Sequence, residues 1–407
     1  MILKGFKDIL PEDIDKWHKL EHSARKVLES FGYKEIRTPI LEKTQLFARG
    51  VGEATDIVEK EMYTFEDRSK ESVTLRPEGT AGVVRAFIDN NLYDTPLKRF
   101  YYIGPMFRHE RPQKGRLRQF HQIGVEVFGI EKAAVDAEIV MVNIKLLSEL
   151  NINDYTIEIN NIGCPVCRPE FSKKLKEYFE KHYDKLCDDC KRRLYRNPLR
   201  ILDCKNKNCS AIARNAPKIT DSVCENCKNH YKEVKQHLDF LKIPYKENPY
   251  LVRGLDYYTK FVFEIKTDRL GAQGTISAGG RYDNLIEQLG GKPTSGIGFA
   301  AGCERLIELM PLADTKPIVF YIANLGVDSY ALEILKTVSE IGATYVEFEN
   351  KSLKAMMKKA NKIKARFAII VGENELKNRE VVLRDLSNST QKTLKFDNIV
   401  DEVKKWL

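Results

Sequence analysis

"RFYYIGPMFRHERPQKGRLRQFHQIGVEVFG", residues 99–129, contains two strand-like segments on either side of a polar loop. Residues 99–108 and 118–130 are rich in aromatic and β-branched side chains, which favour strands. Residues 109–117 between them are mostly polar and include a proline and a glycine, which are typical of loops. The pattern predicts a long β-hairpin.

The loop of this hairpin is strongly basic. Residues 107–122 contain five arginines or lysines and two histidines, which can form a solvated charged loop or bind an anion. The sequence has no GxxxxGK[ST] loop and no GxGxxG after a strand, so a nucleotide would have to be held in another way. Arginine is suited to this because its planar guanidinium grips phosphate oxygens and keeps its charge. The candidates beside apolar segments are Arg108, Arg116, Arg118, Arg253 and Arg305.

Length and composition predict a soluble globular protein of two or three domains. The chain has 407 residues, of which 43% are hydrophobic, 31% charged and 10% aromatic. No apolar stretch is long enough to span a bilayer, and the first residues lack the apolar centre of a signal peptide. We therefore expect a cytoplasmic protein without a membrane partner.

Four regions follow one another along the chain. Residues 1–150 alternate helix-like and strand-like segments, and strand signals return in "LVRGLDYYTKFVFEI" and "GTISAGGRYDNLIEQLGG", before the helix-like "FAAGCERLIELM" at 299–310. The segment 164–249 between these parts has helical patterning and is predicted to be an insertion. Residues 317–407 alternate short apolar strands with helices. One of these helices is rich in lysine, and its lysines face either water or nucleic acid. The fold class is thus α+β for residues 1–316, followed by a smaller α/β domain.

The insertion is basic and rich in cysteine. Residues 164–247 contain twenty Lys or Arg and twelve Asp or Glu, which suits either a phosphate backbone or a solvated surface. In a reducing compartment its cysteines are metal ligands or unused thiols. Three of the four cysteine pairs are C-x-x-C, and the nineteen residues between Cys167 and Cys187 fit a zinc-ribbon interval. Four pairs would indicate two Zn²⁺ sites, with the ligands Cys164, Cys167, Cys187, Cys190, Cys204, Cys209, Cys224 and Cys227.

Three carboxylates lie close in sequence to the basic or strand-like segments: Glu78, Glu110 and Glu126. Each of them can simply neutralise a neighbouring arginine. A buried carboxylate on a sheet can instead receive the ammonium group or the imidazole N–H of a ligand. The residues alone leave both interpretations open.

Five stretches in this order resemble class II aminoacyl-tRNA synthetases, and specifically the histidyl-tRNA synthetases. Residues 31–68, with Pro39, resemble the first class motif, residues 100–129 the second and residues 296–310 the third, while "LVRGLDYYT" and "SAGGRYDNL" match the histidine-specific signatures. The resemblance covers nearly the whole chain. It implies an antiparallel-sheet catalytic domain over residues 1–316, an anticodon-binding domain over 317–407, and a homodimer formed through the first motif.

The resemblance also implies the residues that bind ATP. Arg108 would contact the α-phosphate, and Arg116 and Arg305 the outer phosphates. Phe120 would pack on the adenine ring, with Glu110 near its amino group. Some relatives have an aromatic residue in place of Leu117, which leaves the packing of the loop near adenine open. In this interpretation the basic loop is a clamp on ATP.

Histidine recognition is implied in the same way. Glu78, Thr80 and Gln122 would hold the ammonium group, while Glu126 and Tyr258 would bind the two imidazole nitrogens. A side chain without two polar edges would leave these buried groups unpaired. The predicted histidine-binding residues are Glu78, Thr80, Gln122, Glu126, Arg253, Tyr257 and Tyr258.

The implied reaction has two catalytic arginines, Arg253 and Arg108, with Mg²⁺ on the outer phosphates of ATP. The insertion would hold the acceptor stem of tRNA(His). Two alternatives bind ligands without turnover. One is a paralogue such as the ATP phosphoribosyltransferase regulatory subunit, and the other is a synthetase-like module that senses uncharged tRNA.

Overall fold

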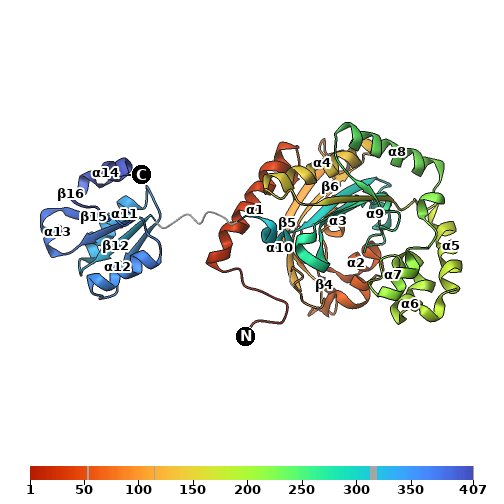
Figure 1. Cartoon of the computed structure of the whole chain (residues 1–407), viewed down its shortest axis with the longest axis horizontal. Coiled ribbons are helices and arrows are strands. Elements are labelled where there is room, and N and C mark those ends of the chain that lie inside the picture. The colour runs from red at the N-terminus through yellow and green to blue at the C-terminus, as the bar shows by residue number, and fades with distance from the viewer. Residues whose placement is uncertain (53–54, 114, 312–318, 407) are drawn as a thin grey trace. The chain divides into compact units, whose positions relative to one another are not determined.

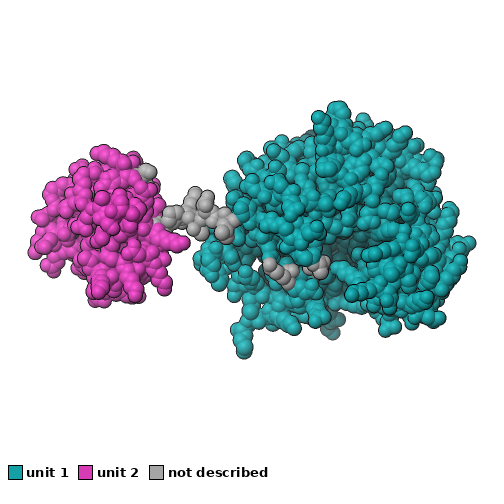
Figure 2. Space-filling model, viewed as in Figure 1, with its two compact units in different colours: residues 1–313 teal, residues 314–407 magenta. Residues whose placement is uncertain are grey.

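The computed structural model describes residues 1–52, 55–113, 115–311 and 319–406. The chain divides into two compact units, residues 1–313 and 314–407 (Figure 2). The predicted domain boundary at residues 316 and 317 lies outside the described residues. None of the helices in the described ranges combines the length and the apolar character needed to cross a membrane.

The predicted hairpin is present in unit 1. Strand β5 (Arg99–Phe107) pairs antiparallel with β6 (Gln119–Phe128), from Arg99 opposite Val127 to Phe107 opposite Gln119. This pair belongs to an eight-stranded sheet with the order β1-β5-β6-β11-β10-β9-β7-β8. Its inner pairings are antiparallel, and the two edge pairings, β1 with β5 and β7 with β8, are parallel. The other strands are β1 (Lys34–Glu35), β7 (Thr156–Asn161), β8 (Lys246–Glu247), β9 (Thr259–Lys266), β10 (Thr275–Arg281) and β11 (Gly296–Gly302).

Strand alternation gives the sheet two different faces. Ile123, Val125 and Val127 of β6 point into a core under α1 (Pro11–Ser30), α4 (Ala133–Glu149), α8 (Glu225–Phe240) and α10 (Cys303–Leu309). Because successive side chains of a strand point to opposite faces, the polar residues at positions 122 and 126 lie on the other face. That face is flanked by α3 (Thr80–Asp89) and by the insertion.

Two predicted segments differ from the structure. Residues 299–302 of the helix-like segment belong to strand β11, because they pair with β6 and β10 on both sides, and the helix begins only at Cys303. The strand expected in "LVRGLDYYTKFVFEI" begins at Thr259, and residues 251–258 form a loop. In both cases the pairing partners, which lie far away in sequence, set the start or end of the strand.

The insertion is helical, as predicted. Figure 1 shows its first helices grouped at one side of unit 1, and α8 returns to pack beside α4. They are α5 (Arg168–Glu180), α6 (Asp188–Arg196) and α7 (Lys207–Ala213), joined by the short turns η3 (Tyr183–Lys185), η4 (Pro198–Ile201) and η5 (Ile219–Asp221). The remaining elements of unit 1 are the small sheet β2 (Leu41–Lys43), β4 (Ser72–Leu75) and β3 (Tyr63–Glu66), with α2 (Thr44–Val51), η1 (Ile57–Glu61), η2 (Leu92–Asp94), η6 (Asp268–Gln273) and α9 (Leu285–Gln288).

Unit 2 has the α/β pattern predicted for the end of the chain. Its five-stranded sheet has the order β13-β12-β14-β15-β16, in which the first three strands are parallel and the last two antiparallel. Helices α11 and α14 cover one face and α12 the other. The strands are β12 (Phe320–Asn324), β13 (Thr344–Glu347), β14 (Phe367–Val371), β15 (Glu380–Asp385) and β16 (Gln391–Lys395), and the helices α11 (Asp328–Val338), α12 (Leu353–Lys362), α13 (Glu373–Asn378), η7 (Phe396–Asn398) and α14 (Ile399–Trp406).

Candidate active site

A cavity of about 610 Å³ lies on the polar face of the main sheet. Its walls come from β6, β9, β10 and β11, from the basic loop and from residues 253–258. The structure brings nearly all of the predicted ligand-binding residues to this one cavity: Glu78, Thr80, Arg108, Glu110, Arg116, Phe120, Gln122, Arg253, Tyr257, Tyr258 and Arg305. Among the candidate arginines, Arg118 has a different place, since it donates to the carbonyl oxygens of Glu110 and Lys4.

One part of the cavity is built around the buried carboxylate of Glu126, which is 1% exposed. The Thr80 hydroxyl donates a hydrogen bond of 2.7 Å to it, and the Tyr282 hydroxyl donates a second. Burial raises the pKa of Glu126 to about 8, although these two hydrogen bonds act to lower it. Thr80 and Tyr282 line the cavity, and Glu126 lies behind them. A ligand would therefore meet the carboxylate together with two hydroxyl groups.

A second buried carboxylate, Glu78, precedes helix α3. It accepts hydrogen bonds of 2.8 Å from the backbone N–H groups of Thr80 and Ala81, and the Tyr257 hydroxyl lies 3.5 Å from it. Burial raises the pKa of Glu78, while the backbone hydrogen bonds lower it. The start of α3 thus holds a carboxylate in place where a cationic group could bind it.

Three buried polar atoms at this cavity have no hydrogen-bond partner within the described part of the chain. They are the amide oxygen of Gln122, the hydroxyl of Tyr102 and Nε of Arg253. Tyr102 lies across the sheet over Gly124, where a Cβ would be under 3.0 Å from its ring. Since buried polar groups are normally paired, these three atoms indicate where a polar ligand would add its own hydrogen bonds.

Arg253 is held by a charged network at the wall of the cavity. It forms an ion pair with Glu264 of β9, and its guanidinium carbon lies 5.7 Å from the ring centroid of Tyr258. Glu264 also contacts Lys266 at 3.1 Å. Burial alone would lower the pKa of Arg253, but the charge of Glu264 and the neighbouring tyrosines raise it above its ordinary value. The guanidinium is therefore charged and restricted in orientation.

Three further arginines line the same cavity. Arg108 donates to the carbonyl of Pro77 at 2.8 Å and lies 5.3 Å from the ring centroid of Phe120. Arg305 donates to the carbonyl of Gly115 at 3.1 Å. Burial lowers the pKa of Arg305, and the positive charges of Arg116 and Arg108 lower it further. Cations that repel one another in a buried site would be stabilised by a polyanion.

Several polar residues of the cavity were not among the predicted site residues, and they include Tyr102, Asp203, Glu264 and Tyr282. Tyr282 lies within the quoted stretch "SAGGRYDNL", and Glu264 occupies an alternating position of an evident strand, so local signals for both exist. Asp203 comes from the insertion, more than 50 residues before β9, and nothing near it in the sequence indicates its place.

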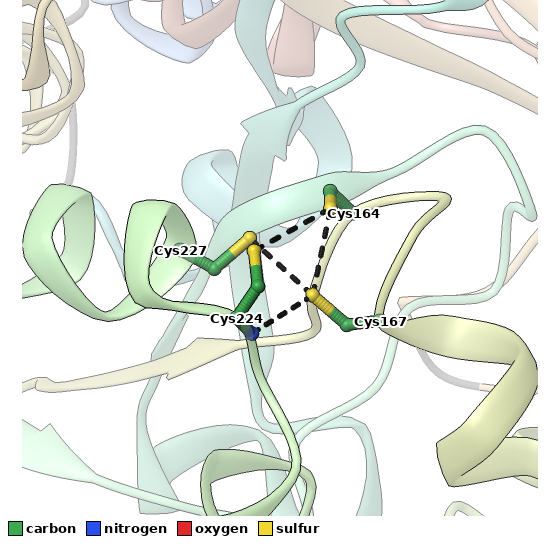
Figure 3. Close-up of side chains that lie close together, drawn as sticks. All are labelled: Cys164, Cys167, Cys224 and Cys227. Atoms are coloured by element: carbon green, nitrogen blue, oxygen red, sulfur yellow. Dashed lines mark hydrogen bonds between the residues drawn. The ribbon is translucent and has the colours of Figure 1, made fainter.

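The eight cysteines of the insertion form two groups of four. Cys164 and Cys167 meet Cys224 and Cys227, and their side chains converge from two chain segments (Figure 3). The second group is Cys187, Cys190, Cys204 and Cys209. The zinc-ribbon interval between the first and second pairs is therefore misleading, because the first pair meets the fourth and the second meets the third. The outer pairs meet where α5 and α8 begin, because Cys167 precedes α5, Cys224 precedes α8, and the N–H of Cys224 donates to Sγ of Cys167.

Comparisons with known proteins show the family of the chain. Residues 5–306 match the family described as histidyl-tRNA synthetase, and residues 316–406 match the anticodon binding domain family. The histidine–tRNA ligase of Thermosipho melanesiensis is 50% identical over 415 residues, which cover 100% of this chain and 98% of the relative. The crystal structure of apo S. aureus histidyl-tRNA synthetase has a TM-score of 0.82 and 36% identity, and the match covers 99% of both chains.

A more distant structure bears on the regulatory alternative. The Bacillus halodurans protein titled ATP phosphoribosyltransferase regulatory subunit/histidyl-tRNA synthetase has a TM-score of 0.63 and 21% identity, over 88% of this chain and 96% of its own. At this identity the likeness shows a shared fold alone. Sequence similarity over the full length, in contrast, is found to relatives named histidine–tRNA ligase, with identities of 50%, 47% and 47% in three of them. This chain belongs to the histidyl-tRNA synthetase family.

Proposed function

We propose that this enzyme activates L-histidine with ATP to histidyl-adenylate, releases pyrophosphate, and transfers the histidyl group to the 3′ end of tRNA(His). The observation that carries the proposal is a single cavity that combines buried carboxylates and tyrosines with four arginines. The first set suits a small cationic amino acid, and the second suits a nucleoside triphosphate.

In this proposal the histidine side chain binds near Glu126 and Tyr258. Glu126 receives an imidazole N–H, directly or through the Thr80 and Tyr282 hydroxyls that it already orients. Glu78 and Gln122 receive the ammonium group, and the unpaired amide oxygen of Gln122 gains a donor there. Leucine or phenylalanine would leave these groups buried and unpaired, which gives the specificity a physical basis.

The arginines bind the triphosphate. Arg108 contacts the α-phosphate, while Arg116 and Arg305 hold the outer phosphates, where their mutual repulsion is relieved by the anion. Phe120 packs against adenine on the side of its ring that faces away from Arg108. Glu110 pairs with Arg116 in the structure, and it becomes available for the adenine amino group when Arg116 binds the phosphates instead. The positive charge of the basic loop thus acts as a clamp.

Mg²⁺ suits this site because hard oxygen ligands are available beside the arginines. The carboxylates of Asp203, Glu264 and Glu304 line the cavity and offer such ligands together with phosphate oxygens. When bound, Mg²⁺ would neutralise part of the charge on the outer phosphates. Zn²⁺ is proposed separately for the cysteine groups, outside the reaction.

Arg253 acts where two anions must meet. An oxygen of the histidine carboxylate attacks the α-phosphorus, the bond to the bridging oxygen breaks, and pyrophosphate leaves with that electron pair. A fixed guanidinium that contacts both the carboxylate and the α-phosphate reduces their repulsion and stabilises the charge of the transition state. The ion pair with Glu264 preorganises Arg253 for this role.

The tRNA and a second copy of the chain are the proposed macromolecular partners. Unit 2 takes the anticodon, and the basic insertion takes the acceptor stem. Homodimerisation through the first class motif is supported by exposed apolar side chains on and beside the small sheet, namely Ile40, Leu41 and Phe65, each at least 41% exposed. Light scattering at micromolar concentration tests this, and a monomer would contradict it.

The reaction is tested by exchange of labelled pyrophosphate into ATP without tRNA, because only reversible formation of an adenylate supports it. Histidine alone among the amino acids is expected to give exchange. Tight histidine binding without exchange would contradict the enzymatic proposal and favour a ligand-binding regulator.

A further inference from the structure

The two cysteine groups have sulfur positions suited to a single tetrahedral ion in each. In the first group, Sγ of Cys167 lies 3.4 Å from that of Cys164 and 3.7 Å from that of Cys227. In the second, the Sγ atoms of Cys187 and Cys204 are 3.8 Å apart. All four sulfurs of each group lie within 4.8 Å of one another. A tetrahedron with zinc–sulfur bonds of about 2.3 Å has edges of about 3.8 Å.

These separations do not correspond to disulfides, whose sulfurs are about 2 Å apart. The nine cysteines are free thiols in the structure. In each group two cysteines are buried and two are partly exposed, so that one side of the group is closed by the protein. The closed side of both groups lies in the same hydrophobic core, which also contains the tyrosines of the active site.

Backbone N–H groups point toward a sulfur atom in both cysteine groups. The N–H of Cys224 donates to Sγ of Cys167 at 3.1 Å, and the N–H of Cys187 donates to Sγ of Cys209 at 3.2 Å. In both cases the donor belongs to the other pair of the same group. Three of the cysteines, Cys167, Cys187 and Cys224, are also the N-caps of α5, α6 and α8. Both features stabilise negative charge on sulfur, which metal binding requires.

Each group is joined to one wall of the active-site cavity. Arg168 follows Cys167 directly and donates to the carbonyl oxygens of Asp256 and Tyr258, in the segment that carries the proposed histidine ligands. Cys204 of the second group lies between Asp203 and Lys205, and both of these line the active-site cavity. Asp203 and Lys205 also line a neighbouring cavity with Arg108, Glu110 and Arg116.

We propose that the insertion binds two structural Zn²⁺ ions, one in Cys164/Cys167/Cys224/Cys227 and one in Cys187/Cys190/Cys204/Cys209. The first ion holds the segment that contains Tyr258 in position, and the second does the same for the loop that contains Asp203 and Lys205. Four thiolates complete each tetrahedron, so the ions are structural and have no open position for water. The bracing of the two walls rests on the proposed function, whereas the metal sites themselves do not.

Metal analysis of the full-length protein, purified without chelators, tests the sites. About two zinc ions per chain are expected in the wild type, and about one each in the variants Cys164→Ser/Cys167→Ser and Cys187→Ser/Cys190→Ser. Cys303→Ala is the matched control, since Cys303 is a buried cysteine outside both groups and its loss should leave two ions. Zinc near zero, or iron in its place, would overturn the proposal.

Two further measurements keep the proposal testable if a variant fails to fold. Growth of the wild type with Co²⁺ should give the visible absorption of tetrahedral cobalt thiolates, and its absence would contradict these sites. In soluble variants, loss of the second site should raise the KM for ATP more than that for histidine, and loss of the first should do the reverse. Equal changes of the two KM values would contradict the proposal that each ion positions a different wall of the cavity. The zinc count would still decide the metal sites independently of any activity.

Discussion

The hydroxyl of Thr80, at the start of α3, donates a 2.7 Å hydrogen bond to the carboxylate of Glu126 in the middle of β6. The two residues are separated by 46 positions in the sequence, and both are buried. This contact joins the helix that positions Glu78 to the strand that forms the floor of the cavity. It therefore couples the two proposed ends of the histidine site.

The raised pKa of Glu126 predicts a specific pH dependence of stability. Its carboxyl group titrates at about 8 in the folded protein, against an ordinary value of 4.5. The stabilising contribution of its proton is therefore complete below about pH 4.5 and is lost as the pH rises through about 8. Glu126→Gln lacks this loss, so its stability relative to the wild type should increase by up to about 1.4 kcal/mol per pH unit within that window.

Urea denaturation of both proteins at pH 5, 6.5 and 8 measures this difference. The same variant should lose most histidine-dependent exchange, because both carboxylate oxygens of Glu126 accept hydrogen bonds, from Thr80 and from Tyr282, and the NH₂ group of glutamine cannot accept either of them. A constant stability difference across the three pH values would show that Glu126 ionises normally.

Arg253→Ala should reduce the rate of pyrophosphate exchange about 10²- to 10³-fold, as expected when a preorganised contact to transition-state charge is removed. Arg253→Lys should recover only part of this rate, since an ammonium keeps the charge but lacks the planar fork. Arg379→Ala is the matched control, because Arg379 pairs with Glu333 at 2.7 Å in unit 2, and its exchange rate should be normal. An unchanged rate in Arg253→Ala would remove the arginine from the mechanism.

Gly298 of β11 is predicted to be intolerant of any side chain. A Cβ there would lie under 3.0 Å from the carbonyl oxygen of Val125 and from the carboxylate of Glu126. Gly298→Ala should therefore destabilise the protein by about 1–3 kcal/mol and weaken histidine binding. Gly50 lies in helix α2, and the atom added in Gly50→Ala would have ordinary contacts of 3.5–3.7 Å with Ala81, Leu285 and Leu289, so thermal unfolding should show no loss. Equal melting temperatures for the two variants would contradict the prediction that a side chain at position 298 clashes with its neighbours.

Removal of one partner of a buried ion pair outside the cavity should strongly destabilise the protein. Nε of Arg281 lies 3.0 Å from both carboxylate oxygens of Asp136, and each of the two side chains is 0% exposed. Asp136→Ala leaves this guanidinium buried with less compensation and should cost about 3–5 kcal/mol of unfolding free energy. Asp13→Ala, which removes an exposed pair with Lys7, should cost less than about 1 kcal/mol. Urea denaturation measures the loss of unfolding free energy in both variants. Similar losses would mean that the burial of the Arg281–Asp136 pair does not increase the cost of breaking it.

Much of the fold could be predicted from local patterns. The hairpin of β5 and β6, the helical insertion and the α/β pattern of the last residues all follow from apolar periodicity, and the structure confirms them. The end of β11 could not be predicted in this way. Residues 299–302 have a composition that suits a helix, but pairing with β6 and β10 overrides this preference.

The same distinction between local patterns and tertiary contacts applies to the candidate site. The sequence by itself predicted the family and the antiparallel hairpin, because motifs and strand alternation are local properties of the chain. The resemblance to the family implied the four arginines of the cavity and two of its tyrosines, Tyr257 and Tyr258. Only the tertiary structure decided that Thr80 and Tyr282 donate to Glu126, that Asp203 reaches the cavity, and that the first cysteine pair meets the fourth. Hydrogen bonds and metal geometry depend on distances of a few ångströms in space, and sequence separation does not encode those distances when the partners are brought together by the packing of separate elements.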